Sequence, residues 1–178
     1  MSPEFEQIRQ EVEELTRNWS DIEWQQAPDG KWSGGQILEH LRLTYTGTTK
    51  GLLKVLEGAQ SLGGKPTWPD RLRTFVVTRV GYIPANGIAP HPTVPGTGLT
   101  QHSIRRFYDA LVAMDATLSD AERRFGSRTK ILDHPKLGLL NAAEWRRFHR
   151  RHAKHHLKQA AERIRIASSA ILEQETVA

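Results

Sequence analysis

The chain has 178 residues, of which 38% are apolar and 25% charged, and this composition fits one soluble globular domain over residues 1–178. It contains no cysteine, which excludes disulfides, thiolate metal ligands and a cysteine nucleophile. The acidic N-terminus is unlike a signal or transit peptide, and no apolar run reaches the length of a membrane span, so we expect a cytoplasmic protein. The net charge of +5 favours anionic partners only weakly.

The first predicted helix begins at Pro3, because Ser2 is a suitable N-cap and proline is favoured at the first helical position. Its apolar residues alternate spacings of three and four, which is typical of an amphipathic bundle helix. This stripe predicts one continuous helix to Ile22 and consists of Phe5, Ile8, Val12, Leu15, Trp19 and Ile22. The sequence PDG at 28–30 then interrupts the pattern.

The second predicted helix opens at Ser33, which has with Gln36 the spacing of a capping box. In this motif each side chain satisfies an exposed backbone N–H of the first turn. The helix is predicted to run to about Ala59. Its apolar side carries Ile37, Leu41, Leu52 and Val55.

A segment of about 40 residues separates the second helix from the third. Residues 70–80 are apolar enough for a short helix or a buried strand, and residues 82–98 are rich in proline and glycine and therefore irregular. Such a long connection is typical of a crossover, which would make the second and third helices run parallel.

The third helix is predicted over 101–126, and the fourth from Asn141 to about Leu172. Asn141 can cap the fourth helix, with Glu144 at the reciprocal position. These elements predict an all-α fold, a four-helix bundle with a long crossover between its second and third helices.

The fourth helix carries half of the chain's histidines. Steps of four and three from Trp145 place three of them, His149, His152 and His156, on the inward stripe. The fourth, His155, is expected toward solvent, beside Phe148 and Arg151. The inward imidazoles are either hydrogen-bonding core residues or ligands of one ion, because side chains at i and i+4 share a helix face.

The second helix offers a third histidine for the pair His152 and His156. His40 lies at the edge of its apolar face, level with Thr44 and Gly47, whose small side chains would leave space beside the imidazole. Across a bundle from His152 and His156, His40 becomes a third candidate ligand.

These segments resemble a known family. WSGGQILEHL (32–41) and HAKHHLKQ (152–159) resemble the DinB-like (DinB/YfiT) superfamily of four-helix metalloproteins, and the C-terminal pattern HPxxG…EW…HxxHHLxQ resembles one of its branches. The resemblance implies that His40, His152 and His156 bind one divalent metal ion. His149 would be an extra ligand or line the pocket, and Gln159 would support a ligand from the next turn.

The resemblance also implies a function. Several members of the superfamily activate a low-molecular-weight thiol (bacillithiol, mycothiol or glutathione) and add it to a small electrophile. We therefore expect a metal-dependent transferase with a small-molecule substrate, and zinc, nickel, iron or manganese would suit imidazole ligands. Arg73, Arg146 and Arg150 are candidates for holding the carboxylates of such a thiol.

Other functions stay open from sequence. A metal-dependent hydrolase would need a base near the ion, and Glu39 points about 100° away from His40 on the helix. Tyr45 and Tyr82 could donate hydrogen bonds to a substrate. A non-enzymatic protein could use the metal site or the basic fourth helix alone, but no nucleic-acid-binding fold accompanies that helix. A homodimer is compatible with the sequence and not required by it.

Overall fold

The computed structural model describes residues 1–28, 30–58, 69, 74 and 91–177, with side chains through residue 166 and at Ser169. The described helices are α1 (Pro3–Thr16), α2 (Asp21–Gln25), α3 (Gly34–Glu57), α5 (Arg105–Phe125) and α6 (Ala142–Val177), together with the short 3-10 helix η2 (His91–Thr93). Strands β1 (Leu132–His134) and β2 (Gly138–Leu140) form one small antiparallel hairpin. The predicted all-α class is confirmed.

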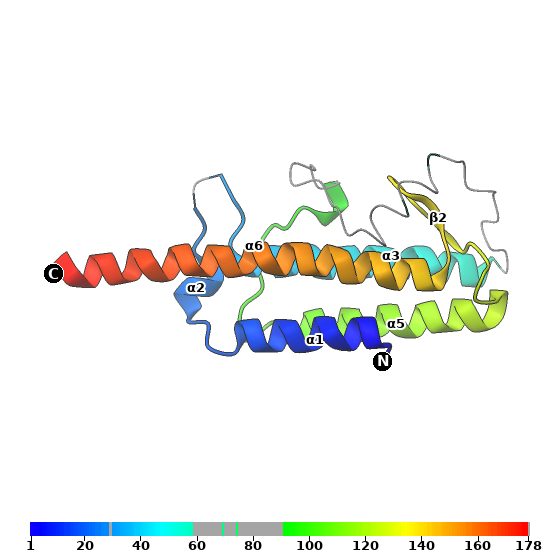
Figure 1. Ribbon diagram of the computed structural model, residues 1–178, viewed down its shortest axis with the longest axis horizontal. Coiled ribbons are helices and arrows are strands. Elements are labelled where there is room, and N and C mark those ends of the chain that lie inside the picture. The colour runs from blue at the N-terminus through cyan, green and yellow to red at the C-terminus, as the bar shows by residue number, and fades with distance from the viewer. Residues whose placement is uncertain (29, 59–68, 70–73, 75–90, 178) are drawn as a thin grey trace.

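The long helices form a bundle in which α1 and α6 run one way and α3 and α5 run the other (Figure 1). The C-terminal ends of the parallel pair meet where Arg124 Nη1 donates to Leu56 O at 2.9 Å. This is the arrangement that the long crossover predicted. Except for Thr74, the predicted element over 70–80 lies outside the described residues, as do residues 82–90 of the predicted irregular segment.

The predicted first helix is wrong in its length. The stripe from Phe5 to Val12 is buried as expected, but α1 ends at Thr16 and a second helix starts at Asp21. Ser20 caps α2 in a capping box with Glu23, a local signal that competes with the continuing apolar stripe. As a result Trp24 enters the core, and Ile22, placed in the stripe by its spacing, is 56% exposed.

Helix α3 begins as predicted, with Gln36 N donating to Ser33 Oγ and Ser33 N donating to Gln36 Oε1. A strap of residues 91–99 lies directly on this end of the helix, where Leu99 N donates to Gly35 O at 3.0 Å. A Cβ at position 35 would lie 2.2 Å from Leu99 O, so only glycine allows the approach. The strap and the first turn of α3 are therefore held as one unit.

The third and fourth long helices differ from prediction at their starts. Helix α5 begins at Arg105, four residues after the predicted start, because Ser103 closes a turn on Thr100 instead of entering the helix. The hairpin of β1 and β2 was not predicted. Helix α6 starts where expected, with Glu144 N donating to Asn141 Oδ1 and Asn141 N to Glu144 Oε2.

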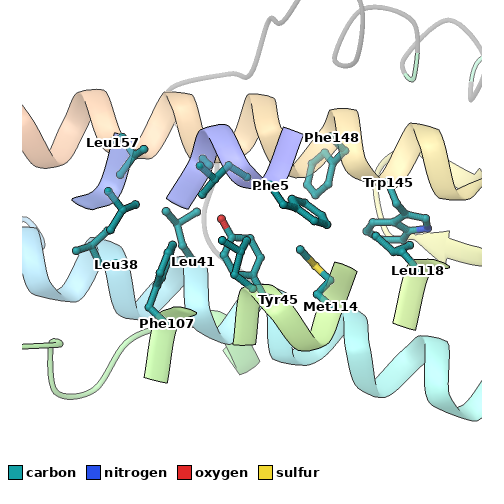
Figure 2. Packing of buried hydrophobic residues seen from close by; sticks show 14 of the residues in the cluster. Phe5, Leu38, Leu41, Tyr45, Phe107, Met114, Leu118, Trp145, Phe148 and Leu157 are labelled. Carbon is teal, nitrogen blue, oxygen red and sulfur yellow. The ribbon is translucent and has the colours of Figure 1, made fainter. Parts of the chain in front are cut away.

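The core lies between all four long helices. Figure 2 shows Phe5 of α1, Tyr45 of α3 and Met114 of α5 in the same interior. Trp145 of α6 lies further along the bundle, beside Leu118 of α5. Each of these side chains is buried, which makes the interior continuous along the bundle. No helix in the described part of the chain combines the length and hydropathy needed to cross a membrane.

Two glycines of α3 give a matched test of the strap. Gly35→Ala should lower the free energy of unfolding by about 1–3 kcal/mol, because its methyl group would collide with backbone oxygens of Leu99 and Trp24. In Gly47→Ala no atom lies within 4 Å of the new Cβ, so this change should raise the free energy of unfolding by about 0.5–1 kcal/mol. Urea unfolding of both variants checks this, and equal effects would contradict the close packing at Gly35.

Candidate metal centre

Three histidines from two helices converge in the bundle. His40 comes from α3, and His152 and His156 lie one turn apart on α6, so that one helix face presents both imidazoles. One nitrogen from each ring lies within 4.8 Å of the others. The ring centroid of His40 is 5.3 Å from that of His152 and 4.7 Å from that of His156. Such a cluster could hold one metal ion.

Hydrogen bonds fix which nitrogen is available in two of the three rings. His40 Nδ1 lies 2.7 Å from Thr93 O, and since a carbonyl can only accept, Nδ1 carries the proton and Nε2 keeps its lone pair. His156 Nδ1 lies 2.8 Å from Gln159 Oε1, which leaves its Nε2 in the same state. His156 Nε2 and His152 Nε2 are 3.1 Å apart, near the roughly 3.4 Å expected for two nitrogens on one tetrahedral ion.

Gln159 links the cluster to a fourth histidine. While its Oε1 accepts from His156, its Nε2 lies 3.2 Å from His155 Nε2 and can donate to it. The predicted supporting position of Gln159 thus matches its contacts. His155, expected to point toward solvent, is only half-exposed and lies beside His156 through this amide.

Burial keeps the three imidazoles neutral. Desolvation lowers the pKa of His156 to about 3, with the nearby His40 as a smaller cause. The pKa of His152 lies well below its ordinary value, first because of burial and then because of His156 and His40. Burial also lowers the pKa of His40, against the opposing hydrogen bond to Thr93. Near neutral pH all three are therefore in the form that binds metals.

Aromatic rings enclose the cluster. The ring of Trp32 lies 5.2 Å from His40, and Phe148 stacks on His152 at 5.4 Å and 14°. The prediction that Phe148 faces solvent is wrong, because the hairpin places His134 against it at 4.4 Å and buries it. The helical phase alone does not account for the hairpin, so it predicts that Phe148 lies outside the inward stripe of the helix.

The predicted pocket residues outside the cluster have contacts of their own. The Thr44 hydroxyl donates to His40 O within its own helix, and Gly47 is exposed. His149 is fully buried but does not join the cluster. Its ring stacks on Trp145 at 5.4 Å and meets Tyr45 edge-on at 5.4 Å, and neither of its nitrogens has a hydrogen-bond partner among the described residues.

The predicted substrate-binding arginines are used in the fold. Arg146 donates to Glu122 and Ser119 of α5, and Arg150 donates to Glu11 and Gln7 of α1. These guanidinium groups connect α6 to neighbouring helices, and their role in holding a thiol stays a prediction. Arg73 and Tyr82 lie outside the described residues.

Sequence reasoning missed Thr93, whose main-chain oxygen orients His40. The contact depends on the strap, held to α3 by Leu99 and by Gln36 Nε2, which donates to Gly96 O at 3.3 Å. No side-chain pattern marks a backbone acceptor. The nearest signal is the pair of glycines at 35 and 98, where each backbone approaches the other too closely for a Cβ.

Comparison with known families agrees with this arrangement. The family model of the DinB superfamily matches residues 4–160, which include the whole histidine cluster and Gln159. The chain belongs to the DinB superfamily. No curated protein and no solved structure matches it significantly. For this DinB superfamily member, membership and the histidine cluster together are consistent with one metal ion, whose identity stays open.

His149 leads to a prediction about pH. Burial lowers its pKa to about 3, with His134 as a smaller cause, whereas an unfolded histidine titrates near 6.5. Between these values the unfolded chain binds a proton that the folded chain does not, so the free energy of unfolding falls as pH falls. In metal-free buffer, His149→Leu should make this fall shallower by up to about 1.4 kcal/mol per pH unit. Urea unfolding of both proteins between neutral pH and pH 5 measures the free energy of unfolding as a function of pH. If the wild-type and His149→Leu curves are parallel, the prediction is contradicted.

Proposed function

We propose that this DinB superfamily member is a divalent-metal-dependent transferase that joins the sulfur of a low-molecular-weight thiol to a small electrophile. The observation that carries the proposal is the convergence of three neutral imidazoles. In two of them, His40 and His156, a hydrogen bond at Nδ1 leaves the lone pair of Nε2 available. Zinc, nickel, iron and manganese all accept imidazole ligands, and the donor set does not choose between them.

The residues that would hold the ion are His40, His152 and His156. Thr93 O and Gln159 Oε1 orient two of the rings, which is the usual role of hydrogen-bond partners behind metal ligands. A closed structural zinc site generally has four protein ligands, and this cluster has three. When bound, a divalent ion would supply an open coordination position and lower the pKa of a thiol or water there.

The surrounding residues favour a thiol over water as the nucleophile. No Asp or Glu among the described residues joins the cluster, and Glu39, the carboxylate next to His40 in sequence, pairs with Arg42. Water ionises far less readily than a thiol, whose pKa is near 8.5, and gains more from a base. The chain has no cysteine, so the sulfur would come from a cosubstrate.

In the proposed reaction, the thiol loses its proton to solvent and its sulfur forms a bond with the electrophilic carbon. The leaving group departs with the electron pair of the broken bond, so no oxidant or reductant is needed. The chain's own contribution is to hold the site dry on two sides, where Trp32 covers His40 and Phe148 covers His152.

Metal content should follow the geometry of the cluster. His40→Ala and His152→Ala should lose the divalent ion that the wild-type protein retains. Gln159→Leu should weaken binding by roughly 10- to 100-fold, as expected for a lost orienting partner. His102→Ala is the matched control, because it removes an exposed histidine outside the cluster. Elemental analysis and competition with a chelating dye measure these effects, and full retention by His152→Ala would overturn the site.

Activity is tested with a panel of thiols (glutathione, bacillithiol and mycothiol) and an activated aryl halide. We expect thioether formation that needs added metal and falls to background in His152→Ala. Product mass spectra identify the new bond. If the metal-loaded protein forms no thioether, the transferase proposal is contradicted. If it hydrolyses esters in a metal-dependent reaction without thiol, the protein is a hydrolase instead.

A further inference from the structure

A second candidate site lies between α1 and α6, separate from the histidine cluster. It is an open groove of about 250 Å³ lined by Glu4, Gln7, Arg147, Arg150, Arg151 and Lys154. We refer to it as the α1/α6 groove. Four cations and one carboxylate line it, so its charge balance is strongly positive.

The groove and the metal-ligand candidates occupy opposite faces of α6. At about 100° per residue, Arg147, Arg151 and Lys154 fall within an arc of roughly 60°. His152 and His156 lie roughly 130–170° from the centre of that arc. A ligand in the groove would therefore not reach the histidine cluster, and the two sites can be tested independently.

Two of the four cations, Arg147 and Lys154, have an unsatisfied charge or donor among the described residues. Arg150 is satisfied by Glu11 and Gln7. The Nε–H of Arg147 is buried without an acceptor among the described residues. Lys154 is exposed and forms no ion pair within the described part of the chain. A buried donor without an acceptor is unfavourable, and a guanidinium in this state is suited to an incoming oxyanion.

We propose that the α1/α6 groove binds a small ligand through a phosphate group. A phosphate dianion matches two unpaired cations in charge, and its oxygens can accept from the Arg147 guanidinium and the Lys154 ammonium together. Glu4 lines the groove from α1, and its charge would repel an extended phosphate backbone laid along the groove. This carboxylate favours a compact anion over a nucleic acid.

The probe is inorganic phosphate, titrated into protein treated with a chelator so that the metal site does not contribute. Binding is followed by calorimetry and by the ¹⁵N resonance of the Arg147 Nε–H, which reports on this groove alone. Saturable binding should shift that resonance. Arg147→Gln and Lys154→Gln should each weaken binding by about tenfold, the equivalent of roughly 1.4 kcal/mol.

Two further variants separate a site from general charge. Glu4→Gln removes the competing carboxylate and should tighten phosphate binding severalfold. Arg105→Gln removes one positive charge at an exposed position of α5 outside the groove lining and should leave binding unchanged. Lys154 is exposed, so its variant remains informative if Arg147→Gln unfolds.

Three results would overturn the proposal. The first is a lack of saturable phosphate binding by the wild-type protein. The second is an equal loss of affinity in Arg105→Gln and Lys154→Gln, which would indicate net charge alone. The third is tight binding of a single-stranded oligonucleotide by a protein that does not bind phosphate, which would assign the basic face to nucleic acid.

Discussion

The arrangement of the candidate metal centre depends on one close backbone contact. Leu99 N donates to Gly35 O, and the approach is possible because position 35 has no Cβ. This contact seats the strap on α3 and brings Thr93 O against His40. The ring orientation of His40 is therefore set by a segment distant in sequence. A substitution that disturbs the start of α3 would change the geometry of the candidate metal centre, although it alters none of the candidate ligands.

Helix α6 presents two chemically different faces from one continuous element. Its inner face buries His149 and His152, whose pKa values fall because the core does not solvate an imidazolium. Its outer face carries Arg147 and Lys154, which line the positively charged α1/α6 groove. The stability cost of holding polar rings inside is visible at His149, since neither nitrogen has a partner in the described structure. One continuous helix thus carries the candidate metal ligands on one face and a positively charged groove on the other.

Local signals allowed much of this to be predicted. The capping residues Ser33 and Asn141 fixed two helix starts, and the helical phase brought His152 and His156 to one inner face. The predictions that failed concern features that depend on non-local contacts. Phe148 is buried by a hairpin whose strands are too short to show a period-two pattern, and Thr93 acts through a main-chain oxygen. Prediction from periodicity describes a helix in isolation, whereas these two features exist only after packing.

The convergence of α3 and α6 has a consequence for the mechanics of folding. His40 and His152 stand at opposite ends of a loop that contains the crossover, α5 and the hairpin. A bound ion would close that loop as a cross-link, in a chain that cannot form a disulfide. Because the ion would bind the folded chain far better than the unfolded one, the supply of metal would regulate how long the molecule survives proteolysis.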